Sequence, residues 1–297
     1  MPQDDEVLIK LEAVSLNGSD WELLRAKPSY SRLFGLFRPS IGILGSDIAG
    51  RVEAVGASVT EFQIGDEVYG DLFGSWGGFA EYVCGKAGKL LHKPKELTFD
   101  EAATLPQGGV IALQGLRDLG KVRAGQHVLI NGAGGSCGVF AVQMAKLYGA
   151  TVTAVDNTHK QDCLRSMGAD HVIDYTTEDF SRRAARYDLI FDLVAYRSLF
   201  IQKRVLKPSG RYILVGGSMA RLLQTLVIGS LISLFGNKKM SVLGHMQNNT
   251  DIAHVAELCT SGEIKPVIAR RFPLAELREA LLCAGQGRAC GKVVITF

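Results

Sequence analysis

The chain has 297 residues, enough for one large domain or two of ordinary size, and we expect two. Its 33 Lys and Arg residues nearly balance its 30 Asp and Glu residues, and no long run of like charge occurs. This composition lacks the basic footprint of a nucleic-acid-binding protein and suits a small neutral partner instead.

The N-terminal segment, residues 1–6, is acidic and has no apolar core. It resembles neither a secretory signal nor an Arg-rich transit peptide, so we expect a cytoplasmic protein. The longest apolar stretch, 222–235, is interrupted by polar residues and is shorter than the roughly 20 residues that span a bilayer. We therefore expect no membrane span. The stretch has the spacing of an amphipathic helix in a core, a pocket lid or a subunit interface, with membrane contact as the alternative.

The first part of the chain, from residue 7 to about residue 95, contains short β-type runs separated by glycine. Examples are residues 7–11, 50–56 and 79–83. This spacing predicts a compact, mostly antiparallel sheet or barrel.

From about residue 125, short apolar strands alternate with helical segments, which is typical of βαβ units on a parallel sheet. The predicted strands cover residues 127–130, 151–155, 171–173, 189–193, 212–215 and 240–243, and the predicted helices lie near 136–148, 159–167 and 198–206. Six such strands make a doubly wound sheet. A final strand at 291–297 is expected to return to the first domain.

Residues 128–145 comprise an apolar strand, a glycine-rich turn from Gly132 to Gly138, and an amphipathic helix. Glycine lets the backbone approach a ligand closely, and the amides and dipole at a helix start attract a pyrophosphate. A glycine turn alone can be purely structural, so the strand before it and the helix after it carry the assignment. The segment predicts dinucleotide binding.

The strand after this helix ends in Asp156, 18 residues beyond Gly138, where an acidic residue binds the adenosine ribose hydroxyls. A polar residue at a strand end can also be a turn former or a helix cap. A carboxylate there accepts from a 2′-hydroxyl and repels a 2′-phosphate, whereas Lys160, in the next helical turn, would accommodate the phosphate. The sequence favours NAD(H) and leaves NADP(H) open.

Ordered blocks along nearly the whole chain resemble the zinc-free quinone oxidoreductase branch of the medium-chain dehydrogenase/reductase superfamily. Besides the glycine loop, the blocks are AVSLNGSDW at 13–21, LGSDIAGRV at 44–52, GDEVYG at 65–70, GFAEYV at 78–83, AATLP at 102–106, GADHVIDY at 168–175 and GKVV at 291–294. The resemblance implies an α/β protein with a GroES-like β-rich catalytic domain, residues 1–97 and 262–297, and a Rossmann dinucleotide-binding domain, residues 98–261. It also implies N-terminal strands that are missing from this sequence.

The resemblance also implies where the cofactor is bound. The implied contacts are Gly132, Gly135, Ser136, Cys137 and Gly138 at the pyrophosphate, Asp156 and Lys160 near the ribose, Tyr175 near the adenine, Gly216, Gly217 and Ser218 on the nicotinamide side, and Lys292 closing over the cofactor from a C-terminal loop.

Two residues are candidates for a catalytic role. Asn17 could donate a hydrogen bond to a carbonyl or to the nicotinamide ribose, or simply tie down a loop. Tyr30 could donate a proton, although an isolated loop tyrosine is more often a packing residue.

Zinc alcohol dehydrogenases of the same superfamily hold a catalytic zinc through Cys, His, an acid and Cys. The aligned positions here are Asn17, Ser46 with Asp47, and the neighbourhood of Gly108. Asp47 alone is a plausible ligand, and one carboxylate cannot build a site that needs three protein ligands. The sequence contains no HExxH and no closely spaced run of cysteines. We therefore expect no bound metal.

Without a Lewis acid, the favoured chemistry is hydride transfer from the nicotinamide to an activated acceptor, a quinone or an α,β-unsaturated carbonyl. The sequence thus predicts a zinc-independent NAD(P)(H)-dependent oxidoreductase (EC 1.-.-.-). Ile111, where relatives often have Thr, and Ala195-Tyr196, where Gly-Asn is common, leave an alternative open. That alternative is a dinucleotide-binding protein with little turnover, a sensor or scaffold. The predicted strand 240–243 lies at a sheet edge that relatives use for dimers, so a homodimer is possible.

Overall fold

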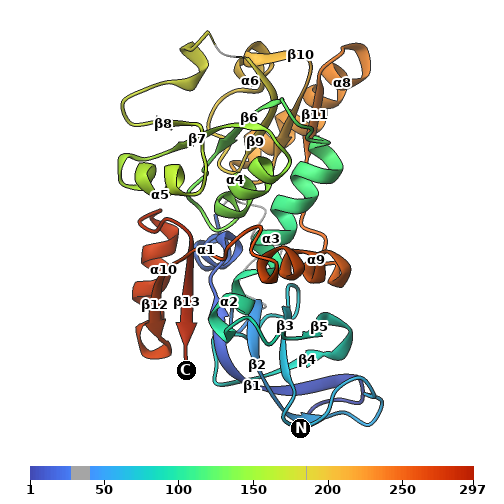
Figure 1. Ribbon diagram of the computed structural model, residues 1–297. Coiled ribbons are helices and arrows are strands. Elements are labelled where there is room, and N and C mark those ends of the chain that lie inside the picture. The colour runs from blue at the N-terminus through green and yellow to red at the C-terminus, as the bar shows by residue number, and fades with distance from the viewer. Residues whose placement is uncertain (28–40, 185) are drawn as a thin grey trace. The chain divides into compact units, whose positions relative to one another are not determined.

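The computed structural model describes residues 1–27, 41–184 and 186–297, so the candidate Tyr30 lies outside the described residues. The chain divides into two compact units, the first made of residues 1–110 and 247–297 and the second of residues 111–246 (Figure 1). The boundaries expected from the sequence were 97/98 and 261/262. The structure thus assigns helix α9 (Asn249–Thr260) to the first unit.

The first unit is built on a seven-stranded sheet ordered β12-β13-β1-β2-β3-β5, in which β4 also pairs with β1. The pairings are antiparallel, as the glycine-punctuated runs predict, except that β12 and β13 are parallel. The strands are β1 (Glu6–Ser15), β2 (Asp47–Val55), β3 (Glu67–Asp71), β4 (Tyr82–Lys86), β5 (Leu90–His92), β12 (Ile268–Pro273) and β13 (Lys292–Thr296). The helices are α1 (Gly18–Arg25), α2 (Phe99–Thr104), α3 (Pro106–Leu113), which continues into the second unit, α9, and α10 (Leu277–Gly285).

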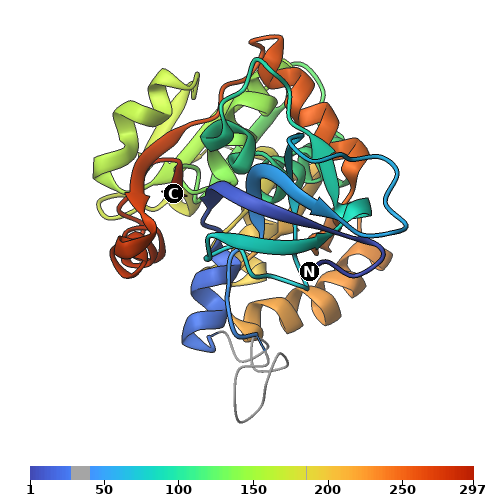
Figure 2. The same ribbon diagram turned by 90° about the horizontal axis from the view of Figure 1, so that it is seen from below.

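The central strand β1 joins the two ends of the chain. Its apolar side chains alternate with polar ones, so that Val7, Ile9 and Leu11 are buried while Lys10 is exposed. Near its end, Ala13 pairs with Thr296 of β13. Both termini therefore belong to this unit (Figures 1 and 2).

The second unit is a six-stranded parallel sheet ordered β11-β10-β9-β6-β7-β8. Its strands are β6 (His127–Asn131), β7 (Thr151–Asp156), β8 (His171–Asp174), β9 (Tyr187–Asp192), β10 (Leu206–Leu214) and β11 (Lys239–Val242). Its helices are α4 (Gly138–Leu147), α5 (Gln161–Ser166), α6 (Leu199–Val205), α7 (Met219–Gln224) and α8 (Ser230–Phe235). All six predicted strands are present, which confirms the doubly wound Rossmann sheet.

The strand order of this sheet reverses beside β6. The strands β7 and β8 follow on one side, and β9, β10 and β11 follow on the other. In doubly wound sheets, ligands bind beyond the carboxyl ends of the strands at such a reversal. The glycine-rich turn follows β6 directly, so the fold places it where a ligand is expected.

A buried carboxylate at the end of β9 fixes this edge of the sheet. Asp192 is fully buried and accepts hydrogen bonds from Asn131 (2.8 Å), Gln202 (3.0 Å), Tyr212 (3.0 Å) and the amide of Ala195 (2.8 Å). Burial raises its pKa, and these donors oppose that effect. The network ties β6, α6 and β10 to β9.

The apolar stretch 222–235 is helical, as predicted. It runs through α7, a π-helical turn (Thr225–Gly229) and α8, and its inner face packs against the core beneath β10 and β11. No helix among the described residues is long and apolar enough to cross a membrane. The strand β11 lies at the sheet edge, as the sequence predicts, while a homodimer stays a prediction.

The pairing of β1 with β2 requires glycine at position 50. A side chain on Gly50 would overlap the carbonyl oxygen of Lys10 on β1, and that backbone cannot move without breaking the ladder. We expect Gly50→Ala to destabilise the first unit by about 1–3 kcal/mol through overpacking. Calorimetric melting should show the loss, whereas Gly88→Ala, which has open space for the new methyl group, should melt like the wild type. Equal melting of both variants would contradict this account.

Candidate active site

The glycine-rich turn closes on itself before α4 begins. The amides of Gly132 and Ala133 donate to the carbonyl of Val155 at 2.9 and 3.2 Å, and Gly132 has a φ of 84°. A side chain on Gly138 would overlap the carbonyl oxygen of Ala133. The turn therefore needs these glycines for its own geometry. The binding of a dinucleotide pyrophosphate at this helix start stays a prediction.

Asp156 and Lys160 form a buried ion pair beneath the turn. Their charged atoms are 3.3 Å apart, and the two residues are 6% and 5% exposed. Asp156 also accepts hydrogen bonds from the amides of Gly134 at 2.8 Å and Asn157 at 2.9 Å. Any side chain on Gly134 would meet Lys160, so this glycine lets the pair approach the loop. Asp156, which favours NAD(H), and Lys160, which would accommodate NADP(H), are thus paired with each other.

Tyr175 lies beside Asp156 at the carboxyl end of the neighbouring strand. Its amide donates to the carbonyl of Asp156 at 3.1 Å, and its ring is exposed. It lines a surface hollow of about 470 Å³ whose other lining residues are Thr176, Thr177, Glu178, Asp179, Arg182 and Arg183. The implied ribose and adenine contacts are therefore neighbours in the structure.

The turn after β10 lies at the same edge of the sheet. A side chain on Gly216 would meet the carbonyl oxygen of Leu193 at 2.7 Å, and Gly217 has a φ of 144°. The hydroxyl of Ser218 accepts from the amide of Arg221 and caps α7. The backbone explains both glycines, and the implied contact of this turn with the nicotinamide stays a prediction.

The first unit contains a separate buried polar network centred on Asp47. The ammonium of Lys292 donates to the amide oxygen of Asn17 at 2.8 Å and lies 3.3 Å from the Asp47 carboxylate. The same carboxylate accepts from the backbone amide of Gln107 at 3.1 Å. Lys292 and Asp47 are both fully buried. The network joins the strand ends of β1, β2 and β13 to the start of α3.

The position of Lys292 corrects an expectation. It does not lie in a loop but begins β13, where β13 pairs with β12, and its ammonium is held inside the first unit. The motif GKVV reads as a loop followed by a strand, and the burial of the lysine depends on a carboxylate 245 positions away. Its contact with a cofactor stays a prediction.

Burial governs the charges of the carboxylates around this network. It raises the pKa of Asp47 to about 6, against the opposing effect of Lys292, and it raises the pKa of Asp20 to about 7. Asp20 accepts from the amides of Asn17 at 2.8 Å and Gly45 at 3.0 Å, so it is a structural residue at the start of α1. The Lys292 ammonium thus interacts electrostatically with both buried carboxyl groups, Asp47 and Asp20.

Two buried side-chain amides in this network have a nitrogen that makes no hydrogen bond of normal geometry. The amide nitrogens of Asn17 and Gln107 have no hydrogen-bond partner, and both residues are only 5% exposed. The Asn17 group lies near enough to Asp47 to lower its pKa, yet its nitrogen makes no bond of normal geometry. The sequence pointed to Asn17 but not to Gln107, because a glutamine after the AATLP block matches no motif.

The donor set does not fit a zinc ion. Across residues 1–27, 41–184 and 186–297, no group of three or more His, Cys, Asp or Glu side chains is arranged to hold a metal. Asp47 is the one residue at the aligned zinc-ligand positions that could bind zinc, and its carboxylate already interacts with the Lys292 ammonium and the Gln107 backbone amide. The residues present therefore disagree with a catalytic zinc site.

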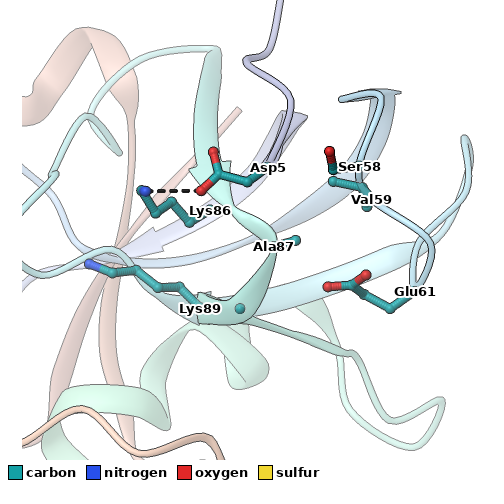
Figure 3. A pocket seen from close by; sticks show the side chains of 8 residues that line it. Asp5, Ser58, Val59, Glu61, Lys86, Ala87 and Lys89 are labelled. Carbon is teal, nitrogen blue, oxygen red and sulfur yellow. Dashed lines mark hydrogen bonds and ion pairs between the residues drawn. The ribbon is translucent and has the colours of Figure 1, made fainter.

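The first unit has another hollow, of about 290 Å³ (Figure 3). None of the residues that line it belongs to the buried network around Asp47. Its rim includes an ion pair of 2.9 Å between Lys86 and Asp5, whose side chains are both exposed. An exposed pair contributes little energy and no special reactivity. This hollow is not the candidate active site.

Known proteins resemble the chain over nearly its whole length. A model of the alcohol dehydrogenase GroES-like domain matches residues 3–95, and a model described as zinc-binding dehydrogenase matches residues 167–295. The chloroplastic quinone-oxidoreductase QR1 of Triphysaria versicolor is 32% identical over 99% of this chain and 90% of its own. The NADPH-dependent alkenal/one oxidoreductase, chloroplastic, of Arabidopsis thaliana is 31% identical over 99% of this chain and 72% of its own.

A solved structure, the quinone oxidoreductase from Coxiella burnetii, superposes with a TM-score of 0.89 at 27% identity, covering 100% of this chain and 92% of that one. These likenesses confirm the α/β fold with its GroES-like and Rossmann parts. The expected cytoplasmic location stays a prediction, since the two relatives above carry chloroplastic names. The chain belongs to the quinone oxidoreductase-like branch of the medium-chain dehydrogenase/reductase superfamily.

Proposed function

We propose that this protein reduces quinones or α,β-unsaturated carbonyl compounds by hydride transfer from a reduced nicotinamide cofactor, without a metal. The observation that carries the proposal is the pair of buried amide nitrogens, on Asn17 and Gln107, that make no hydrogen bond of normal geometry within the protein. A buried donor left unpaired costs about 1–3 kcal/mol, a cost that a ligand oxygen would remove. Family membership supports the reductase assignment.

The orientation of the Asn17 amide follows from its partner. An ammonium has only donors, so the Asn17 atom that faces Lys292 must be the oxygen. The nitrogen then points away from Lys292. The Gln107 oxygen similarly accepts from the hydroxyl of Ser19 at 3.0 Å, which leaves its nitrogen as the open donor. Both donors are thus held in place before a substrate arrives.

The cofactor supplies the hydride, and the protein supplies position and charge stabilisation. Addition of hydride to the β-carbon of an enone, or to a quinone, places negative charge on the acceptor oxygen. Donors held rigidly toward that oxygen stabilise the charge more than the starting carbonyl. Lys292 strengthens the Asn17 donor, because its positive charge polarises the same amide group.

The open amides predict a specific kinetic defect. We expect Asn17→Ala and Gln107→Ala each to lower kcat/KM for a quinone or enone by roughly 10²-fold, since an oxyanion donor is lost. Affinity for reduced cofactor should change little. Asn249→Ala is the matched control, because the Asn249 amide already donates to the carbonyls of Gly88 and Leu90.

Steady-state oxidation of reduced cofactor with a panel of acceptors checks this expectation. Unchanged kcat/KM in both variants would remove the assigned role of the amides. If the wild type binds cofactor but turns over no acceptor, the alternative of a dinucleotide-binding sensor or scaffold replaces the reductase.

We also propose that NAD(H) is the preferred cofactor. The support is Asp156, whose negative charge lies at the end of β7 and disfavours a 2′-phosphate. Lys160 is already paired with it, so this lysine is not an independent phosphate ligand.

The ion pair predicts how the preference can be changed. We expect Asp156→Ser to release Lys160 and to shift the ratio of NADH to NADPH affinity toward NADPH by about tenfold, or roughly 1.4 kcal/mol. Fluorescence titration of both cofactors measures the ratio. Asp162→Ser, which removes an exposed acid on α5, should leave it unchanged. Tighter binding of NADPH by the wild type would contradict the proposed preference.

Metal analysis tests the zinc-independent part of the proposal. We expect the purified protein to hold far less than one zinc per chain and to keep its activity after dialysis against EDTA, because Asp47 is committed to Lys292. Stoichiometric zinc, or loss of turnover that zinc restores, would overturn it.

A further inference from the structure

The outward face of the helical segment 219–235 in the second unit carries a row of apolar side chains. The row, named here the apolar stripe, consists of Leu223, Leu226, Val227, Leu231, Leu234 and Phe235, which are 49–83% exposed. Spacings of three and four residues place these side chains on one side of a helix. The opposite side is buried at Thr225 and Gly229. On that side Leu222, Ile228 and Ile232 pack against the core of the unit, so the helix is apolar on both sides, although packing within the unit uses only one.

The sequence around the apolar stripe has basic but no acidic residues. No Asp or Glu occurs between Asp192 and Asp251. The basic residues in this interval are Arg197, Lys203, Arg204, Lys207, Arg211, Arg221, Lys238 and Lys239. Since the whole chain carries only three more basic than acidic residues, the rest of it is net negative. The interval that contains the stripe is thus the basic part of the sequence, and two of its cations, Arg197 and Lys207, are paired with acids from outside it.

Several of these cations gather at the end of α8. Lys238 donates to the carbonyls of Lys203 at 2.6 Å and Leu206 at 2.8 Å, and Lys239 donates to the carbonyl of Ser233 at 2.7 Å. Among the described residues, Lys203, Lys238 and Lys239 make no ion pair with a carboxylate. The pKa of Lys238 is lowered by burial and then by Lys203 and Arg186, as expected for cations without a counter-charge. These three lysines are named here the basic cluster.

We propose that the apolar stripe and the basic cluster together bind the surface of a bilayer that contains anionic phospholipid. The stripe would enter the boundary between headgroups and acyl chains, and the cluster would meet the headgroup phosphates. Because no described helix can cross a membrane, the contact is peripheral. Neither element belongs to the proposed reductase site, so the inference is independent of the proposed function.

A second copy of the chain is the competing occupant, because β11 is an edge strand and lies beside α8 (Figure 1). A two-fold dimer would use the same patch on both subunits. Such a patch would offer the partner's basic cluster no acidic side chain from residues 193–250, because that interval contains no Asp or Glu. An anionic surface complements both features of the patch, and this favours the bilayer.

Vesicle flotation with the full chain tests the proposal without cofactor or acceptor. We expect the protein to float with vesicles of phosphatidylcholine mixed with phosphatidylglycerol and to remain behind with phosphatidylcholine alone. Raising the salt concentration should weaken the binding, since screening acts on the headgroup contacts. Equal binding to both kinds of vesicle, or to neither, would overturn the proposal.

Variants separate the two parts of the surface. Leu231→Ser with Phe235→Ser, and separately Lys203→Glu with Lys239→Glu, should each weaken binding to the mixed vesicles at least tenfold. The matched controls lie in the first unit: Leu24→Ser with Ile64→Ser, and Lys10→Glu with Lys95→Glu, all exposed positions. The controls should bind like the wild type. Unchanged binding of either stripe or cluster variant would contradict the assignment.

Sedimentation of the same proteins tests whether a second copy of the chain, and not a bilayer, covers the patch. If the wild type is a dimer that Leu231→Ser with Phe235→Ser converts to a monomer, and it does not float with mixed vesicles, the patch is a subunit interface and the proposal fails. Unchanged melting and cofactor affinity in the lysine variants would show that lost flotation reflects lost charge and not unfolding.

Discussion

The buried ion pair between Lys292 and Asp47 is the interaction on which the first unit and its site depend. Neither residue is exposed, and removing two charges from water costs several kcal/mol each unless further hydrogen bonds compensate. Here the compensation comes from Asn17 and from the backbone amide of Gln107. Four distant segments of sequence must meet for the pair to be tolerated. The same contacts that make the charges acceptable also hold the two open amide donors.

The Rossmann sheet could be predicted from sequence because its signals are local. Short apolar strands, helices of matching length and a glycine turn specify six strands in sequence order, and all were found. The start of β10 was missed: the strand was expected at 212–215, yet it extends back to Leu206 across an irregular register with β9. Pairing with a neighbour overrode the local preference there.

The candidate site was less accessible to sequence reasoning, for a physical reason. Asn17 was found through its place in a motif, but the state of its amide depends on Lys292, 275 positions away. Asp156 and Lys160 were recognised individually as opposing signals for the cofactor, whereas the structure pairs them. Gln107 carried no signal at all. Which polar atoms a fold satisfies and which it leaves open is a property of packing, and no local pattern encodes it.

The central place of β1 between β2, β4 and β13 has a consequence for synthesis on the ribosome. The second unit is continuous in the chain and can fold as soon as residue 246 has emerged, as domains generally do during translation. The first unit begins earlier but lacks β12 and β13 until residues 268–296 have been made. Asp47 therefore has no lysine partner while the N-terminal strands are already made, and the buried ion pair forms only after β13 has been synthesised.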